Sequence, residues 1–144
     1  MNTIYKLLLL SVMFLLFSTS YINAQDESDQ HIVTVTTFHL KFPLDGTNKE
    51  FNDMWKDYFD KVLSKSSEVI SRSVYRHFWG SDNTQLVLVS EFKNLQDLMA
   101  SEKTENDLFE KAYPNKDDQD KFNKIFSKYV GNHSDEIYHL VNKK

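Results

Sequence analysis

The stretch of residues 68–92 constrains the fold more than any other part of the chain. Two runs rich in β-branched and aromatic residues, 69–79 and 85–92, flank the turn-forming cluster at 80–83. Glycine tolerates a positive φ, and Asp and Asn side chains can bond their own backbone, so this cluster predicts a hairpin turn. The chain is therefore expected to contain an antiparallel sheet built around this hairpin.

A register follows from the length of the loop. A four-residue loop places Trp79 opposite Thr84 and Arg72 opposite Glu91, an opposite-charge pair that stabilises the sheet by about 0.2–1 kcal/mol. A two-residue loop would instead set Val74 against Glu91. Side chains alternate between faces, so we expect one face to carry Tyr75, His77, Trp79, Leu86 and Leu88, and the other to carry Ile70, Val74, Phe78, Val87 and Val89. Both faces are partly apolar and need cover.

The first 24 residues have the pattern of a secretory signal peptide. Lys6 precedes an apolar run at 7–17, and the small residue Ala24 precedes Gln25. A membrane anchor is the alternative, but a spanning helix needs about 20 apolar residues and this run is shorter. We expect cleavage near Ala24, after which the protein has no membrane attachment. The expected location is the periplasm or the extracellular space, and a bacterium is the most expected source. Residues 25–30 read as a disordered leader and 31–144 as a single domain.

Composition excludes several classes of function. The chain has no cysteine, which excludes disulfides, thiol catalysis, cysteine–metal sites and a lipoprotein anchor. After removal of Lys6 with the signal peptide, 21 acidic residues face 16 basic ones, a charge of −5. Nucleic-acid-binding proteins present a clustered basic patch, so no nucleic acid is expected as a partner. We also expect no cofactor, since no nucleotide-binding motif is present.

The first strand and the first helix follow from local patterns. Residues 31–42 are β-branched and aromatic, which predicts a strand whose even positions form the more apolar face. Thr47 and Glu50 match a capping box at the start of a helix. Apolar residues then recur at helical spacing at Phe51, Met54, Trp55, Tyr58, Phe59, Val62 and Leu63. Such aromatic density can also mark a cofactor site, but a helix packed on a sheet explains the period more simply.

Two further helices and a final strand follow the hairpin. Asn94 can cap a second helix, which we expect to be bent because the charged run 101–107 interrupts its apolar stripe. Asn115 can cap a third helix, which Gly131 is expected to end in the C′ position. The last strand is predicted at 136–142.

The order β-α-β-β-α(α)-β predicts an α+β, ferredoxin-like domain with a four-stranded antiparallel sheet and its helices on one side. In this order, in the central hairpin of 68–92 and in the strand-then-helix entry at 92–95, the chain resembles the dimeric α/β-barrel superfamily, which includes the antibiotic-biosynthesis-monooxygenase-like proteins. The resemblance implies a homodimer whose two sheets pack face to face, and a ligand cleft between sheet and helices. Haem-degrading members use an Asn on the first strand, and this strand has none, so that activity is not carried over.

Candidate site residues come mainly from the aromatic and histidine positions. Tyr75, His77 and Trp79 form the best ligand-binding candidate, with packing at the end of the sheet as the alternative. His39 and His139 lie within strands and could meet across the sheet. No metal site is expected. His133 and Asp135 offer only two ligands and are better explained as a loop cap.

Arg72 and Arg76 are candidates for binding an anion, although pairing with Glu91 is the simpler use of Arg72. No hydrolase, P-loop or metalloprotease motif is present. Two hypotheses remain. The protein is an exported dimer that binds a small apolar or aromatic ligand, with cofactor-free oxygenase or isomerase chemistry as an extension, or it is a non-catalytic interaction module of the cell envelope.

Overall fold

The computed structural model describes residues 31–141, which form one four-stranded antiparallel sheet and its helices. In chain order the elements are β1 (Ile32–Leu40), α2 (Asn48–Lys61), η1 (Leu63–Lys65), β2 (Val69–Arg76), β3 (Gln85–Phe92), α3 (Leu95–Ala112), α4 (Lys116–Tyr129) and β4 (Val130–His139). The strands lie in the order β2-β3-β1-β4. This confirms the predicted ferredoxin-like α+β class. The predicted signal peptide at 1–24 and leader at 25–30 lie outside the described residues.

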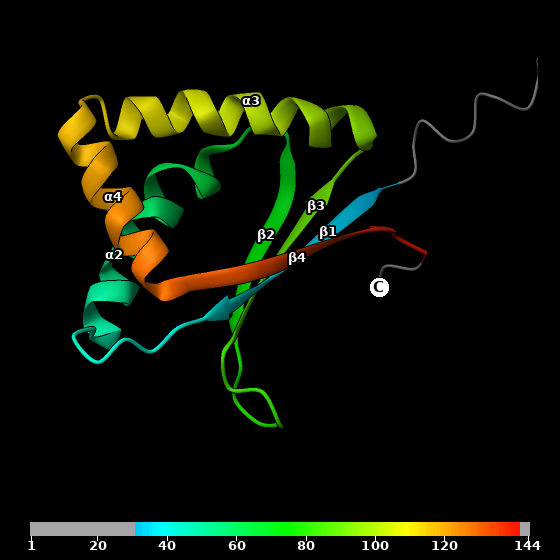
Figure 1. Cartoon of the computed structure of the whole chain (residues 1–144). Coiled ribbons are helices and arrows are strands. Elements are labelled where there is room, and N and C mark those ends of the chain that lie inside the picture. The colour runs from blue at the N-terminus through cyan, green and yellow to red at the C-terminus, as the bar shows by residue number, and fades with distance from the viewer. Residues whose placement is uncertain (1–30, 142–144) are drawn as a thin grey trace, which may run out of the picture.

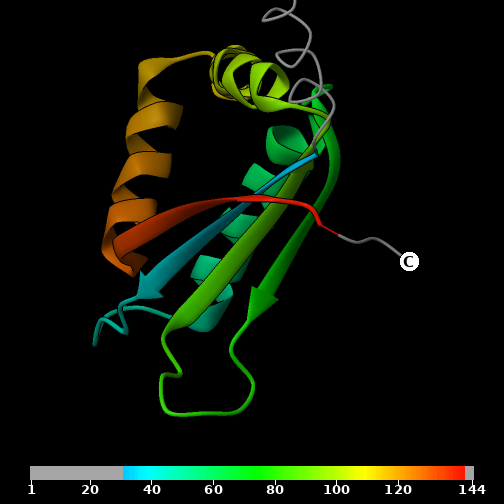
Figure 2. The same ribbon diagram turned by 90° about the vertical axis from the view of Figure 1, so that its right-hand side faces the viewer.

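The helices occupy one side of the sheet. Helices α2 and α4 lie beside each other on one face, and α3 runs across the end of the sheet near β2 and β3 (Figure 1). In the view turned by 90°, the strands lie in front of α2, with α4 to the left and α3 at the top (Figure 2). The loop at 77–84 projects beyond the end of the sheet (Figure 1). Between residues 31 and 141 no helix is long and apolar enough to cross a membrane.

The core lies between the sheet and the predicted apolar stripe of α2. Phe51, Met54 and Trp55 are buried, as the helical spacing predicted. The rings of Trp55 and Phe38 of β1 meet edge to face with centroids 5.6 Å apart. Burying each such side chain contributes about 1.5–3 kcal/mol. The aromatic density of α2 is therefore used first of all to hold the helix on the sheet.

All three helix caps predicted from the sequence are present. In each, a side-chain oxygen at the N-cap accepts a hydrogen bond from the backbone N–H three residues later, namely Thr47 from Glu50 (3.1 Å), Asn94 from Asp97 (2.8 Å) and Asn115 from Asp118 (2.9 Å). An N-cap of this type is worth about 1 kcal/mol. At Thr47 the reciprocal half of the predicted capping box is not formed, because the Thr47 N–H donates to the Tyr129 hydroxyl and not to Glu50.

The predicted hairpin register is wrong by one residue. Ser71 lies opposite Glu91 and Arg72 opposite Ser90, and the same register continues to the backbone bond from His77 to Gln85, so the difference arises at the hairpin loop. A one-residue change of register moves every side chain of the strand to the other face. A separate shift between Val69 and Ser71 marks a bulge at Ile70, at the far end of the strand. Arg72 therefore does not lie opposite Glu91, as the sequence had suggested.

The observed register also corrects the two predicted faces. Val74 packs against the core beneath the helices together with Leu86 and Leu88. Tyr75 lies opposite Val87 on the face without helices and is 57% exposed. This face, called the open face below, carries Val33, Val35, Thr37, Ser73, Tyr75, Val87 and Val89.

Helix α3 is one continuous helix of 18 residues, so the predicted bend is wrong. Within the polar run, Glu102, Lys103, Asn106 and Asp107 are exposed, whereas Ser101, Thr104 and Glu105 are at least partly buried and have partners. The Ser101 side chain, in a residue only 4% exposed, donates to the Leu98 carbonyl at 2.8 Å, and Thr104 donates to Glu68 at 2.9 Å. Paired polar groups can be buried without breaking a helix.

Strand β4 starts at Val130, directly after α4, and not at residue 136 as predicted. Gly131 lies within this strand and does not end the helix, and it has no positive φ. A Cβ at this position would lie 2.7 Å from the His39 carbonyl oxygen, so the residue is small because β1 passes so close. The predicted loop at 131–135 is therefore strand.

Candidate functional site

An open groove lies between α2 and the β2 edge of the sheet. Its volume is about 450 Å³, and it is lined by Phe51, Asn52, Trp55, Lys56, Phe59, Val74, Arg76 and Leu86. The apolar members come from the core-facing stripe of α2 and from the helix-side positions of β2 and β3. The observed register, which pairs Val74 with Leu88 and Arg76 with Leu86, places these two residues of β2 on this side. Groove size and lining resemble those of small-molecule sites, which are mostly apolar with a few polar groups.

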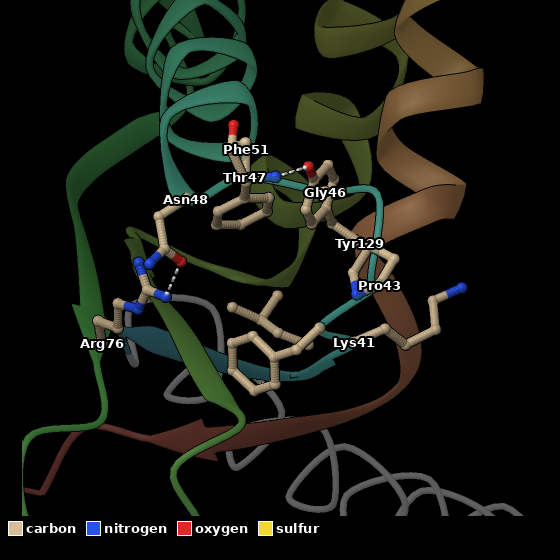
Figure 3. Close-up of a pocket in the computed structure, with 10 residues that line it drawn as sticks. Lys41, Pro43, Gly46, Thr47, Asn48, Phe51, Arg76 and Tyr129 are labelled. Atoms are coloured by element: carbon tan, nitrogen blue, oxygen red, sulfur yellow. Dashed lines mark hydrogen bonds between the residues drawn. The ribbon is translucent and has the colours of Figure 1, made fainter.

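A smaller cavity of about 170 Å³ adjoins the first turn of α2 and shares two lining residues with the groove, Phe51 and Arg76. It lies under the loop that joins β1 to α2. Arg76 enters from the side of β2, whereas Lys41 points outward (Figure 3). Arg76 is thus the charged residue that lines both the groove and the cavity.

The charge of Arg76 is not neutralised by a carboxylate. Its Nη1 and Nη2 donate to the side-chain oxygens of Asn52 and Asn48, each at 3.3 Å. Arg76 takes part in none of the ion pairs found among residues 31–141. By contrast, the other cation of the groove, Lys56, is paired with Asp60. Arg76 therefore offers a full positive charge held only by two neutral amides.

Trp55 lines the groove, and its indole nitrogen is buried. The residue is 8% exposed, and its indole Nε1 is the one buried side-chain nitrogen or oxygen among residues 31–141 without a hydrogen-bond partner. An unpaired buried donor costs about 1–3 kcal/mol. Native proteins rarely retain such a group without a functional or structural reason.

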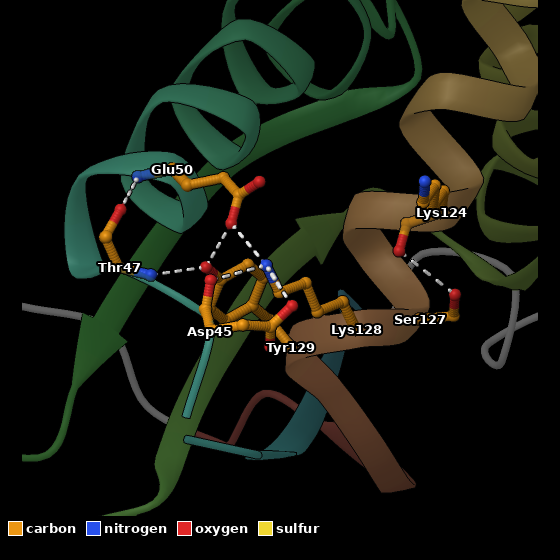
Figure 4. A network of polar contacts seen from close by, with 7 residues as sticks. All are labelled: Asp45, Thr47, Glu50, Lys124, Ser127, Lys128 and Tyr129. Carbon is orange, nitrogen blue, oxygen red and sulfur yellow. Dashed lines mark hydrogen bonds and ion pairs between the residues drawn. The ribbon is translucent and has the colours of Figure 1, made fainter. Parts of the chain in front are cut away.

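A polar network fixes the loop and the first turn of α2 beside the cavity. The Thr47 N–H donates to the Tyr129 hydroxyl at 2.6 Å, and that hydroxyl donates to the Glu50 carboxylate. Lys128 Nζ lies 3.0 Å from the same carboxylate (Figure 4). The Tyr129 hydroxyl thus bridges the Thr47 N–H and the Glu50 carboxylate, the two groups that the predicted capping box would have joined directly. Its hydrogen bond, followed by that of Lys128, holds the pKa of Glu50 below its ordinary value.

The predicted aromatic trio does not line this groove. Tyr75 lies on the open face, and Trp79 is 90% exposed in the hairpin loop. The His77 N–H donates to the Gln85 carbonyl at 3.1 Å, so His77 extends the same row of the open face. The predicted helix-side position of the trio is therefore wrong, and its role in ligand binding stays a prediction.

The four remaining candidates lie apart from the groove. His39 Nδ1 is 3.3 Å from both Asp82 and Thr84, at the base of the hairpin loop. His139 lies opposite Ile32 at the other end of β1, so the predicted meeting of the two histidines across the sheet is wrong.

His133 Nε2 and the Asp135 carboxylate are 3.2 Å apart on β4, and Asp135 also accepts a hydrogen bond from Thr36. They lie in a strand and not in the loop that was predicted for them. Within residues 31–141 no group of three or more His, Cys, Asp or Glu side chains is placed to hold a metal ion.

The groove residues of α2 were assigned from the sequence to core packing alone. Phe51, Trp55 and Phe59 do pack, but they also form one wall of the groove. The available signal was the aromatic density of this stripe, in which Trp55 and Tyr58 also carry hydrogen-bond donors. Arg76 was named as an anion-binding candidate; it lines the groove, and its role in binding an anion stays a prediction.

The comparisons with known proteins show the fold. No protein-family model and no curated protein matches this sequence. A NIPSNAP family protein of unknown function from Agrobacterium tumefaciens superposes with a TM-score of 0.53 at 12% identity, covering 78% of this chain and 89% of that one. A dimeric ferredoxin-like protein from an uncultured marine organism gives 0.52 at 12% identity, with 83% and 96% covered.

The cofactor-independent oxygenase SnoaB from Streptomyces nogalater gives a TM-score of 0.45 at 9% identity, covering 79% of this chain and 96% of that one. At this level the likeness to SnoaB supports no conclusion about chemistry. The chain has a ferredoxin-like fold, and its likeness to these neighbours is one of fold alone.

Proposed function

We propose that this protein binds a small apolar or aromatic ligand in the groove between α2 and β2. The observation that carries the proposal is the groove itself, which is open, lined by aromatic and aliphatic side chains, and bordered by one unneutralised cation. The resemblance to the dimeric α/β-barrel superfamily, in which ligands bind between sheet and helices, favours the same location.

The lining favours binding over acid–base catalysis. The eight residues around the groove include no His, Asp or Glu, which are the groups that most often transfer protons near neutral pH. The hydroxyl of Tyr58, on the same helix, is a poor proton donor because burial, together with the nearby Glu105, raises its pKa to about 12. We therefore propose a binding or carrier role for this groove.

Calorimetric titration with octan-1-ol, a neutral apolar probe, tests the proposal. Val74→Phe fills the groove from β2, and we expect it to weaken octanol binding at least several-fold. Ile70→Phe is the matched control, because Ile70 is on the same strand and does not line the groove. Absence of saturable binding to the wild type, or equal binding by the two variants, would contradict the proposal.

We also propose that two copies associate through the open face. Val33, Val35, Val87 and Val89 form an apolar strip at its centre, and polar residues such as Ser73 and Glu91 border it. Two sheets packed face to face would bury this strip. The marine ferredoxin-like neighbour is itself described as dimeric. Because a two-fold interface contains the same strip from both copies, a charge introduced by one substitution would be buried at two symmetry-related positions.

Sedimentation velocity tests the dimer. Val89→Glu is expected to give monomer or aggregate at tens of micromolar, on the order of ordinary assay concentrations. Lys56→Glu, on the helical side, is expected to sediment like the wild type. A monomeric wild type would contradict the open face as an interface.

A second candidate function is a protein-interaction module of the cell envelope. It is favoured by large apolar side chains at one end of the molecule, with Phe78 96% and Trp79 90% exposed on the hairpin loop. Exposed apolar clusters commonly mark interaction sites. Quantitative mass spectrometry of material purified from its own host would separate the two functions. A partner protein lost from Phe78→Ser but retained by Val74→Phe would support the module.

A further inference from the structure

We propose that the ligand of the α2–β2 groove is an amphipathic monocarboxylate, with its carboxylate on Arg76 and its apolar part along Phe51, Trp55 and Phe59. This inference rests on the proposed binding function and names the chemical class of the ligand. Its basis is a cation without a carboxylate partner at the end of an apolar groove.

The positive charge available in the groove indicates a ligand with a single negative charge. Arg76 has only the amide oxygens of Asn48 and Asn52 as partners, at 3.3 Å, which is long for a charged donor. Lys56 is already neutralised by Asp60. A single free guanidinium matches a monoanion better than a doubly charged phosphate.

The surroundings of Arg76 favour a carboxylate as that monoanion. The side chain stands beside the first turn of α2, where Asn48 is the first helical residue and the positive end of the helix dipole adds to the attraction. A guanidinium can donate two parallel hydrogen bonds to a carboxylate, and this geometry strengthens and orients the contact. No acidic side chain lines either the groove or the adjoining cavity, so nothing in the lining repels the anion.

Trp55 contributes to the apolar wall of the groove together with Phe51 and Phe59. Its indole nitrogen is itself buried from solvent, so it is the ring that is available to a ligand in the groove. The apolar rings on either side explain why the rest of the ligand is apolar.

The test compares octanoate with octan-1-ol, which share a chain and differ in charge, by calorimetry on the full mature chain. We expect wild type to bind octanoate about tenfold more tightly than octanol, the size of effect that one charge-assisted hydrogen bond provides. In Arg76→Gln this ratio should fall to about one. Lys49→Gln is the matched control, because it removes an exposed cation from the same first turn without touching the groove, and it should keep the ratio.

Two further measurements keep the inference testable if Arg76→Gln does not fold. The preference of wild type for octanoate should shrink as KCl is raised, because salt screens an exposed charge pair. Octyl phosphate should bind no more tightly than octanoate. Three results would refute the carboxylate proposal: an octanoate-to-octanol affinity ratio that is unchanged in Arg76→Gln, a ratio of about one in wild type, or tighter binding of octyl phosphate than of octanoate. If octanol binds but octanoate is not preferred, the proposed binding function of the groove still stands. If none of the probes binds, the binding function is refuted.

Discussion

Replacing Arg72 with methionine tests the hairpin register and the placement of α3 together. The guanidinium makes three short contacts, with Nε donating to Ser90 Oγ at 2.8 Å, Nη1 to the Leu63 carbonyl at 2.7 Å and Nη2 to Glu105 Oε1 at 2.7 Å. Its side chain is only 7% exposed. The residue therefore ties β2 to β3, to η1 and to α3.

The size of the effect follows from what the substitution leaves behind. Methionine fills much of the same volume but leaves the hydroxyl of Ser90, which is 2% exposed, and the Glu105 carboxylate without their donor. Removing one partner of a buried ion pair costs about 3–5 kcal/mol. The Glu105 side chain remains 21% exposed and can be partly rehydrated, so we expect the lower end, about 3 kcal/mol.

Urea unfolding followed by circular dichroism, at one fixed protein concentration, measures this loss. Arg76→Met is the control, an exposed arginine on the same strand and face, and we expect a loss below about 1 kcal/mol there. In the double-mutant cycle with Glu105→Gln, the coupling energy should reach at least about 1 kcal/mol. A loss for Arg72→Met equal to that of the control, or strict additivity in the cycle, would refute the register and the α3 contact.

Three more predictions follow from the helix start and the N-terminal segment. Thr47→Ala removes the side-chain acceptor of the Glu50 N–H and should cost about 1 kcal/mol in the same unfolding assay, so no loss beyond error would argue against the cap. The pKa of Glu50 is lowered in the folded protein by Tyr129 and then Lys128, so the stability advantage of wild type over Glu50→Gln should be fully present above the ordinary glutamate pKa of about 4.3 and disappear as pH falls through the lowered folded value. An advantage that grows on acidification would contradict the network. Intact-mass measurement of the exported protein should place its N-terminus at or near Gln25, and a product that keeps residues 1–17 would exclude cleavage.

The elements that could be predicted from the sequence depend on chemistry within a few residues. The caps at Thr47, Asn94 and Asn115 each join a side chain to a backbone N–H three residues away, so the sequence window contains both partners. The apolar stripe of α2 is likewise a local period. The element order that followed from these signals was sufficient for the fold class.

The features that could not be predicted depend on contacts between distant segments. The register set at the hairpin loop exchanges the faces of β2, and the partner of Arg72 is Glu105, 33 residues further along. The polar residues of α3 likewise find partners outside the local sequence, as Thr104 does in Glu68. Gly131 looked like a helix end because the close passage of His39 is not visible in the local sequence. For the site, Trp55 and Arg76 could each be noticed, but only the corrected register brings them to one groove.

The central claim is that the groove beside Trp55 and Arg76 binds the ligand, and the indole resonance of Trp55 reports on it most directly. The chain has two tryptophans, so Trp79→Phe, a change at an exposed loop position, leaves Trp55 as the single indole. In a ¹⁵N-correlated NMR titration of this variant with octanoate, we expect the Trp55 Nε1–H signal to shift saturably with the affinity found by calorimetry. Adding Arg76→Gln should weaken that response. Octanoate binding detected by calorimetry while the Trp55 signal stays fixed would place the ligand elsewhere and contradict the claim.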